Sequence, residues 1–469
     1  MNIVDLLKSI LFVFNSFFLV YLIVYSTFLF LSSIIGSLIL YRNSNYRKLR
    51  NELKDDYYVP VSIIVPAYNE ELTIIETVKS LLNLHYKLFE IVVVDDGSRD
   101  DTSKKLIDYY SMIEIKIPIK KEIECKNILK VYEKIVNNIK IVLIIKENGG
   151  KADSLNAGIN IASYPYFTCM DADSMLQVDA LEKIVKPVLE DSNVIACGGN
   201  VRISNGVKLK NGKVVDYHLP NKILDSMQVL EYDRSFLASR ILFDQFNGNL
   251  IISGAFGLFK KNIVIAAGGY DASTVGEDFE LVIKLHVFCR MHKIKYSIKY
   301  VSDAVCWSQA PDSFANLFRQ RKRWNKGLLQ GMIKYKELFL NPKYGMVSFV
   351  SFLYFLVYEL FSPFIELIGI ITVIISFLLN LLNIKFMLMF MGIYIVFNSF
   401  LSFSIFLSRL HVENIKLSVY DFWKALLLSI FEITILRFII LTARFSAFIG
   451  YNKQKYVWDR VERKKIEYK

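Results

Sequence analysis

The sequence has few cysteines, and none lies at a spacing that binds metal or forms a redox pair. The five cysteines are odd in number and scattered, with neither CxxC nor Cys/His spacing. We therefore expect buried free thiols, and neither a disulfide framework nor a zinc site. Repeats and flexible linkers are also missing, and no module interleaves arginines with aromatic residues. The net charge of +12 therefore does not indicate nucleic-acid binding.

Long apolar runs lie toward the two ends of the chain, and most of the charge lies in residues 42–345. The apolar run at 9–41 can span a bilayer and is too long for a cleaved signal peptide, so we expect a retained anchor. The basic cluster at 42–50 predicts that the chain continues on the cytoplasmic side. Further apolar runs lie at 346–383, 386–409 and 423–450, and the first is long enough for an interfacial helix plus a span or for two short spans. An even number of crossings there, which we take as four, would return the basic tail to the cytoplasm.

These boundaries predict a multi-pass integral protein of the cell membrane, whose partner is the lipid bilayer and not a nucleic acid. The expected parts are an N-terminal transmembrane anchor (1–45), a cytosolic catalytic domain (46–345), C-terminal transmembrane or interfacial helices (346–452) and a basic cytosolic tail (453–469).

The middle segment alternates short β-branched runs with helical patterns. The expected strands are Val61–Val65, Glu90–Val94, Ile141–Ile145 and Phe167–Met170, and the first is followed by a helix over Glu70–Leu84. Continuous apolar strands separated by helices predict an α/β fold with a mostly parallel sheet covered on both faces. Ligands bind beyond the carboxyl ends of the strands in such sheets, and the acidic motifs of this chain lie at those ends.

Two acidic motifs follow the first two strands: Pro66-Ala-Tyr-Asn-Glu70 and Asp95-Asp96-Gly97-Ser98. A carboxylate at a strand end can accept a hydrogen bond from the NH of a uracil or from a ribose hydroxyl, and Gly97 permits a sharp turn. Taken alone, both motifs fit an ordinary acidic turn as well.

A third motif, Asp171-Ala-Asp173, ends the fourth strand, and Gly150-Lys151 precedes it by some twenty residues. Two carboxylates one residue apart can share Mg²⁺ or Mn²⁺, which would bridge a diphosphate, and Lys151 could add a second positive charge. The alternative is a solvated loop.

The fourth motif, Thr274-Val-Gly-Glu277-Asp278, opens an amphipathic helical run. Its acids could simply cap the helix. They could also supply a general base, Asp278, that takes the proton of an attacking hydroxyl. Attack opposite the leaving group would invert an α-linked donor and give a β-linkage.

The fifth motif is Gln320-Arg-Lys-Arg-Trp324. A basic helix near a membrane span commonly binds anionic head groups. Arginine can also clamp phosphate with two hydrogen bonds, and tryptophan can stack on a sugar ring.

In the order PAYNE, DDGS, GGKA, DAD, SGAFGLF, GED and QRKRW, these motifs resemble the inverting, processive, membrane-integrated family-2 glycosyltransferases. Cellulose, chitin, hyaluronan and bacterial poly-N-acetylglucosamine synthases belong to that group, and the resemblance covers residues 58–335. It implies a GT-A-like (Rossmann-like) catalytic domain inserted between transmembrane helices. The implied reaction moves glucose or N-acetylglucosamine from a UDP-sugar to a growing β-linked polysaccharide at the cytoplasmic face. The C-terminal helices would form an export channel, with accessory export subunits left open.

The resemblance also implies roles for individual residues. The residues expected to bind the donor are Glu70, Asp96, Lys151, Asp171, Gln320, Arg321 and Arg323. Asp171 and Asp173 would bind the metal (Mg²⁺ or Mn²⁺), and Ser253, Gly254 and Trp324 would bind the acceptor. Asp278, with Glu277 beside it, would be catalytic.

One departure weakens an assignment to the cellulose branch: this chain has Gly-Glu-Asp where cellulose synthases carry Thr-Glu-Asp. His218 and His286 are read as structural. A non-processive enzyme acting on a lipid carrier is the main alternative. A transport or scaffold protein with an inactive domain is a third possibility, against which the carboxylates of Asp171, Asp173 and Asp278 argue.

Overall fold

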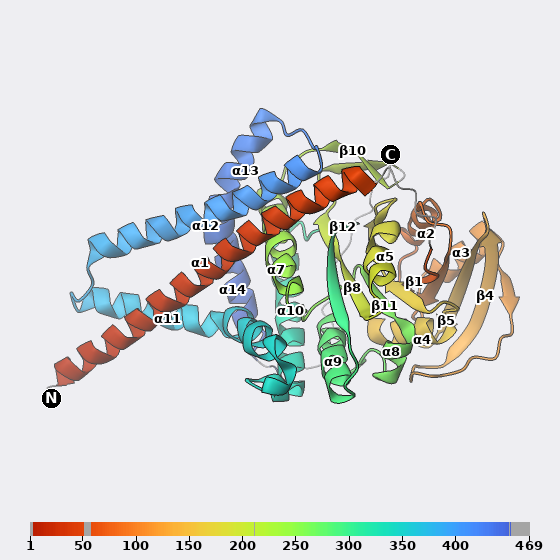
Figure 1. Ribbon diagram of the computed structural model, residues 1–469, viewed down its shortest axis with the longest axis horizontal. Helices are drawn as coiled ribbons and strands as arrows, with labels where there is room; N and C mark the ends of the chain where they lie inside the picture. Colours follow the sequence, from red (N-terminus) through yellow and green to blue (C-terminus); the bar gives the residue numbers. More distant parts are fainter. Residues whose placement is uncertain (1–2, 51–57, 211, 450, 452–469) are drawn as a thin grey trace.

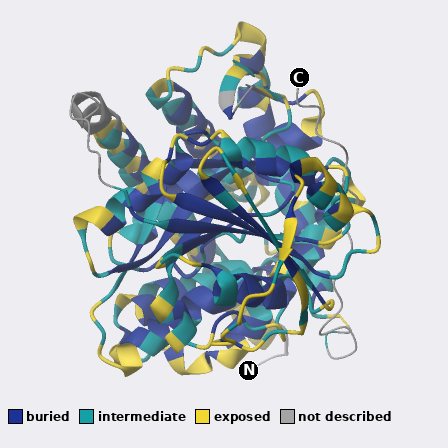
Figure 2. Cartoon of the chain, turned by 90° about the vertical axis from the view of Figure 1, so that its right-hand side faces the viewer, coloured by how far each residue is buried: buried dark blue, intermediate teal, exposed yellow. Residues whose placement is uncertain are grey.

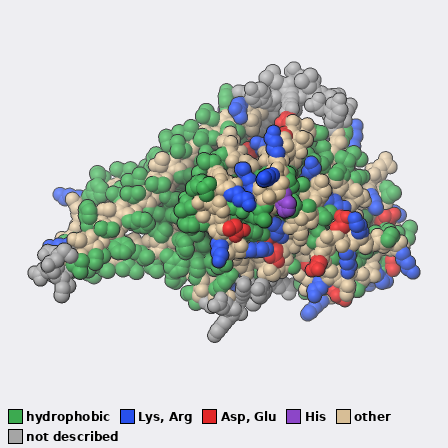
Figure 3. All heavy atoms as spheres, turned by 60° about the horizontal axis from the view of Figure 1, so that its bottom comes forward, with side chains coloured by type: hydrophobic (Ala, Val, Ile, Leu, Met, Phe, Trp, Pro, Cys, Tyr) green, Lys and Arg blue, Asp and Glu red, His purple; other side chains and the backbone are tan. Residues whose placement is uncertain are grey.

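The computed structural model describes residues 3–50, 58–210, 212–449 and 451. It consists of an α/β domain and a group of long helices that extends to one side of it (Figure 1). Hydrophobic side chains cover the helical part, and charged side chains gather over the α/β part (Figure 3). The uneven distribution of charge along the sequence therefore corresponds to two regions in space. The predicted basic tail at 453–469 lies outside the described residues.

The α/β domain is built on a ten-stranded sheet with the order β3-β4-β5-β2-β1-β6-β11-β8-β12-β7. Its centre, β5-β2-β1-β6, is parallel as predicted, and antiparallel pairings extend it on both sides. The strands are β1 (Val61–Ala67), β2 (Phe89–Asp95), β3 (Ile113–Ile115), β4 (Ile128–Val136), β5 (Ile139–Lys146), β6 (Tyr166–Cys169), β7 (Met175–Leu176), β8 (Val194–Ile203), β11 (Gly257–Lys260) and β12 (Ser297–Ser308). A separate hairpin joins β9 (Val207–Lys210) and β10 (Lys213–Tyr217).

Helices cover both faces of this sheet, and the strands between them are buried (Figure 2). One face packs against α2 (Ile74–Leu82), α3 (Thr102–Tyr110) and α5 (Ala180–Glu190); the other packs against α4 (Lys151–Ile161), α8 (Lys261–Ala266) and α9 (Glu277–Met291). Successive side chains of β1 point into different cores, Ile63 into the first and Ile64 into the second. This alternation explains why the central strands are apolar at every position.

Three helices of the apolar part lie side by side: α1 (Ile3–Arg50), α11 (Ser362–Leu378) and α12 (Ile384–Val412) (Figure 1). Polar side chains join them. The Asn15 amide donates to the Ser376 hydroxyl at 3.0 Å, and the Asn398 amide donates to the Ser26 hydroxyl at 3.1 Å. Such hydrogen bonds between small and polar residues hold helices together in lipid, where no hydrophobic force distinguishes a helix from a lipid tail.

The four crossings expected after the catalytic domain are not found in the described part of the chain. Two apolar helices there are long enough to cross a membrane, Ile384–Val412 and Val419–Ser446, and one bent pair, Val347–Leu360 and Ser362–Leu378, turns by 53°. Before the domain, Leu6–Asn43 also qualifies. The first half of the bent pair would extend only about 20 Å, which is too short to span a bilayer by itself. The long apolar run at 346–383 is therefore not two spans.

The last candidate span contains α13 (Val419–Phe431), the π-helical turn η6 (Glu432–Leu436) and α14 (Arg437–Ser446). It runs across the direction of α1, α11 and α12 rather than beside them (Figure 1). The remaining helices connect the two parts: α6 (Ile223–Arg234), η1 (Ser235–Ser239), α7 (Arg240–Asp244), α10 (Phe314–Lys334), η2 (Lys336–Leu338), η3 (Pro342–Tyr344), η4 (Val347–Phe352) and η5 (Phe355–Leu360).

Close packing of α4 on β1 predicts that Gly158 cannot be enlarged. A Cβ atom at Gly158 would lie 2.4 Å from Cγ2 of Ile64, which is fully buried. We expect Gly158→Val to destabilise the protein by about 1–3 kcal/mol through overpacking and to lower its unfolding temperature in detergent. Gly392→Val is the matched control, because a Cβ at Gly392 meets nothing within 4 Å. Equal unfolding temperatures for the two variants would contradict this packing.

Candidate active site

The motif loops meet at one edge of the sheet because the central strands are parallel. Strands β1, β2, β5 and β6 all end there, so the loops that follow them carry Glu70, Asp96, Lys151 and Asp171 to the same edge. Strand β11 runs the opposite way and starts with Gly257 opposite Cys169, so the segment before it enters from the same edge. The carboxyl-edge placement predicted from the sequence is therefore what brings these residues together.

Lys151, the first residue of α4, lies at the centre of this edge. Its Nζ atom is 2.5 Å from Oδ1 of Asp171, 3.5 Å from Oε1 of Glu277 and 3.4 Å from the carbonyl oxygen of Gly254. Burial alone would lower the pKa of Lys151, but the carboxylates of Asp171 and Glu277 outweigh it and raise the pKa above its usual range. One ammonium group therefore touches three of the predicted motifs.

The acid pair at the start of α9 has one buried and one accessible member. Glu277 is buried, and burial raises its pKa, with Lys151 opposing that shift and Asp278 adding to it. Asp278 is only half-buried, and its Oδ2 accepts a hydrogen bond from the backbone NH of Gly254 at 3.2 Å. Asp278 is thus the more accessible acid of the pair, and Gly254 borders it.

Helix α10 brings the Gln-Arg-Lys-Arg-Trp motif to the acid pair through a close contact between two glycines. A Cβ at Gly276 would lie 2.7 Å from Cα of Gly327, so neither position has room for a side chain. The Gln330 amide oxygen accepts hydrogen bonds from the backbone NH of Val275 and the hydroxyl of Thr274, both at 2.9 Å. The loop that precedes Glu277 is thereby fixed to the helix that carries Trp324.

The side chains of this motif differ in their surroundings. Trp324 is 43% exposed, which leaves its ring available for stacking. The Gln320 Oε1 atom is buried with no hydrogen-bond partner among the described residues. It could accept a hydrogen bond from an NH or OH group of a bound ligand. Arg323 contributes an electrostatic interaction with Glu277. Arg321 is buried and donates to Glu231 at 2.7 Å, and its Cζ atom lies 4.3 Å from the centroid of the Trp324 ring. Its guanidinium therefore packs on the tryptophan in this structure.

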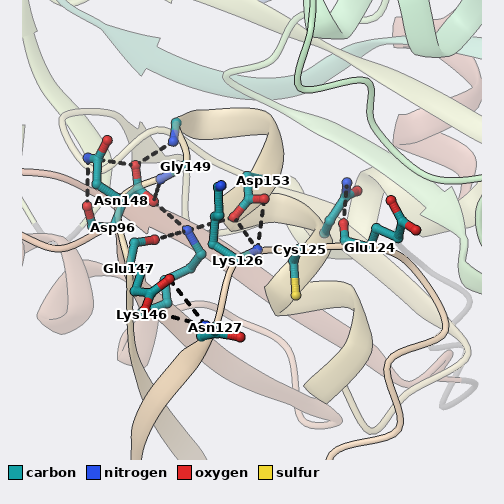
Figure 4. Close-up of polar contacts among 12 residues, drawn as sticks. Asp96, Glu124, Cys125, Lys126, Asn127, Lys146, Glu147, Asn148, Gly149 and Asp153 are labelled. Carbon is teal, nitrogen blue, oxygen red and sulfur yellow. Dashed lines mark hydrogen bonds and ion pairs between the residues drawn. The ribbon is translucent and has the colours of Figure 1, made fainter.

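Asp96 has both carboxylate oxygens occupied (Figure 4). One accepts from Lys146 at 2.6 Å and from the backbone NH of Gly149 at 2.9 Å; the other accepts from the NH of Gly150 at 2.7 Å and from the Asn148 amide at 3.1 Å. A carboxylate has about four acceptor sites, so a nucleoside could bind Asp96 only by replacing one of these donors. In this structure Asp96 shapes the loop that leads to Lys151.

Glu70 lies in the loop after β1, where its Oε2 accepts from the Thr73 hydroxyl at 2.8 Å. Its neighbour Asn69 has φ of 55°, and Gly97 in the adjacent loop has φ of +69°. Asparagine and glycine tolerate this left-handed region, so both turns have suitable residues, as expected for Gly97.

Lys146 is a residue of this edge that the sequence analysis missed. Its side chain is fully buried between Asp96 and Asp153, and its Nζ atom is 2.6 Å from an oxygen of each (Figure 4). Asp153 in turn accepts from the backbone NH of Lys126 at 3.0 and 3.2 Å. A lysine that ends an otherwise apolar strand at the ligand-binding edge is a signal that could have identified it.

The described residues include no group of three or more His, Cys, Asp or Glu side chains that could hold a metal by themselves. Magnesium and manganese sites in nucleotide-dependent enzymes commonly use one or two carboxylates together with substrate phosphates. Asp171 and Asp173, both half-buried at the end of β6, fit that second type of site.

His286 has structural contacts, His218 lies apart from the motif loops described above, and the cysteines form no disulfide. His286 is buried and bonded to the carbonyl of Asn249 at 2.9 Å and to the Tyr296 hydroxyl at 2.8 Å; burial lowers its pKa to about 4. His218, on the surface, lies 3.1 Å from Asp216. The five cysteines are free thiols, four of them buried.

Comparison with known proteins gives a family match. The model of the family described as "Glycosyltransferase like family 2" matches residues 59–327, more than half of the chain. A poly-beta-1,6-N-acetyl-D-glucosamine synthase of Staphylococcus aureus is 31% identical over 312 residues, covering 66% of this chain and 64% of that protein. The synthase of the same name from Staphylococcus epidermidis is 30% identical over 269 residues, covering 57% of this chain and 54% of that protein. The matches thus span less than two thirds of the length of these relatives.

Among solved structures, the mannosyltransferase PcManGT from Pyrobaculum calidifontis, in complex with GDP-Man and Mn²⁺, aligns with a TM-score of 0.49 and 17% identity, covering 84% of this chain and 99% of that one. The family match to the segment that forms the mixed sheet and its motif loops decides the classification: the chain belongs to glycosyltransferase-like family 2.

Proposed function

We propose that this protein is an inverting hexosyltransferase that moves a sugar from a UDP-sugar to the end of a growing β-linked polysaccharide at the cytoplasmic face of the membrane. The observation that carries the proposal is the position of Lys151, whose ammonium contacts Asp171, Glu277 and Gly254. Through it, the donor-side carboxylates, the acid pair and the acceptor-side loop come within a few ångströms of one another, as transfer between two bound sugars requires.

Asp278 is the proposed general base. It removes the proton from the acceptor hydroxyl while that oxygen forms a bond to the anomeric carbon and the bond to the diphosphate breaks. The hydrogen bond from the Gly254 NH and a second one from the Phe279 NH at 2.8 Å hold the carboxylate in a fixed orientation. Glu277, buried beneath it, keeps Lys151 in place rather than reaching the acceptor.

The donor diphosphate would lie among Lys151, Gln320 and Arg323, and a divalent cation held by Asp171 and Asp173 would supply further positive charge to the leaving group when bound. Glu70 and Asp96 remain the proposed nucleoside contacts, with Asp96 acting in part through the loop it holds. Arg321 remains a proposed donor contact, and it also packs on the Trp324 ring.

Trp324 supports a carbohydrate acceptor, because a large exposed ring on the helix that packs against the loop before the acid pair suits stacking on a sugar face. The names of the two staphylococcal relatives favour N-acetylglucosamine over glucose and a polymer over a short glycolipid. Accessory export subunits are compatible with a polymer product. A lipid-linked acceptor remains the alternative reaction.

The arrangement of the apolar helices supports a membrane protein with its catalytic domain in the cytoplasm. If α1, α11 and α12 cross the bilayer side by side, two crossings follow the catalytic domain, and the number is even as expected. The transverse α13 and α14 would then lie at the membrane surface next to α10. The basic residues at 42–50 are consistent with a cytoplasmic end of α1.

Donor and product can be identified on the purified protein in detergent or nanodiscs with Mg²⁺ and Mn²⁺. We expect UDP release from UDP-N-acetylglucosamine and a long polymer by gel or mass spectrometry. Under the same conditions UDP-glucose should give little product. A short glycolipid formed only when lipid acceptor is added would replace the polymerase proposal with the alternative.

Asp278→Asn is expected to lower kcat by about 10²–10⁴-fold, the usual contribution of a general base, while UDP binding by calorimetry persists. Asp271→Asn serves as the control, because Asp271 lies on the same loop but pairs with Lys334 at 2.6 Å, away from the acid pair. Loss of UDP binding in a folded Asp278→Asn protein would argue against a role confined to proton removal.

Metal removal should stop the reaction. We expect thorough chelation with EDTA to abolish UDP release and added Mg²⁺ or Mn²⁺ to restore it. Without the cation, the negative carboxylates of Asp171 and Asp173 would face the negative diphosphate directly. Asp173→Asn should raise the metal concentration needed for half-maximal rate. Full activity after chelation would remove the metal from this site.

A further inference from the structure

The ammonium of Lys151 forms an ion pair with a carboxylate oxygen that the proposed function assigns to a metal. Its Nζ atom is 2.5 Å from Oδ1 of Asp171, and the Lys151 side chain is only 18% exposed. As the first residue of α4, this lysine also places its charge at a helix N-terminus, where the helix dipole disfavours a cation. Its position therefore depends on the carboxylates around it.

A second carboxylate is within reach of the same ammonium. Oε1 of Glu277 is 3.5 Å from Nζ, and the Glu277 side chain is 7% exposed. The lysine can therefore release Asp171 and keep a buried ionic partner through a small movement of the end of its side chain. The carbonyl oxygen of Gly254, at 3.4 Å, is a further acceptor on that side.

We infer that Lys151 is an exchangeable internal cation: it neutralises Asp171 while the site is unloaded and moves to Glu277 and the donor diphosphate when a divalent cation binds. This inference rests on the proposed function and adds a regulatory property to the same site. Since two cations compete for one carboxylate, the free enzyme binds metal weakly. A bound nucleoside diphosphate, which attracts the ammonium, strengthens metal binding, and by linkage metal strengthens nucleotide binding.

The test is Mn²⁺ binding to the full-length protein in detergent without nucleotide, followed by the electron paramagnetic resonance signal of free Mn²⁺. We expect Lys151→Met to tighten Mn²⁺ binding by at least about fivefold, the lower end of typical coupling between sites. A lysine that only binds donor would leave this affinity unchanged, and one that only supports the fold would weaken it. Unchanged or weaker Mn²⁺ binding by the variant would overturn the inference.

Lys284→Met is the matched control for loss of a positive charge. Lys284 is 15% exposed and pairs with Glu280 at 3.2 Å on the same helix as Glu277, but it does not contact Asp171. We expect its Mn²⁺ affinity to equal that of the unmodified protein. The gain in Lys151→Met should also persist at high salt, because salt screens a distant charge more than a direct contact. An equal gain in both variants, or a gain that salt removes, would contradict the exchange.

Two further variants keep the outcome interpretable. Lys151→Gln, which retains a polar side chain, should show the same gain and replaces Lys151→Met if that protein does not fold, as judged by thermal unfolding. Asp171→Asn should lose Mn²⁺ binding. If Asp171→Asn binds Mn²⁺ normally, the metal site of the proposed function is wrong. If it loses binding and both Lys151 variants match the unmodified protein, only the exchange is wrong.

Discussion

The need to neutralise carboxylates gathered at one sheet edge is the constraint on which the site depends. Parallel strands deliver acidic loops to the same place, and the loops would repel one another without compensation. Two lysines provide it, one at each end of the segment that links β5 to α4: Lys146 pairs with Asp96 and Asp153, and Lys151 pairs with Asp171 and Glu277. Buried charges such as Lys146 and Glu277 persist only when they are paired, so these contacts hold neighbouring loops together.

The same principle joins the catalytic domain to the apolar helices. One turn of α6 makes three ion pairs to three different elements: Glu231 with Arg321 of α10 at 2.7 Å, Asp233 with Arg409 of α12 at 3.0 Å, and Arg234 with Glu432 of η6 at 2.6 Å. Removing one partner of a buried pair leaves an uncompensated charge, which is costly. These pairs therefore connect the helix that carries Trp324, through α6, to α12 and η6.

Contacts between elements distant in the sequence account for the residues whose surroundings differ from expectation. Asp96 was expected to face a nucleoside, but the backbone NH groups of Gly149 and Gly150 and the ammonium of Lys146 reach it first. Arg321 was expected to bind a diphosphate, and one of its guanidinium nitrogens is paired with Glu231 on α6. Neither partner lies near these residues in the sequence, so no spacing rule could have indicated them. The number of crossings expected after the catalytic domain was wrong for a related reason. Hydropathy measures how apolar the run at 346–383 is, and not whether its helices bend.

The sequence by itself determined the family, the parallel centre of the sheet, the edge at which the motifs gather and the presence of apolar helices on both sides of the catalytic segment. These properties follow from local patterns: β-branched runs, turn residues such as Gly97, and motifs directly after strands. Tertiary structure alone decided which carboxylate each lysine neutralises, that Asp278 is the accessible acid and Glu277 the buried one, and that α13 and α14 lie across the other helices. Those outcomes depend on packing, because burial and the nearest opposite charge are set by elements that the chain brings together only when it folds.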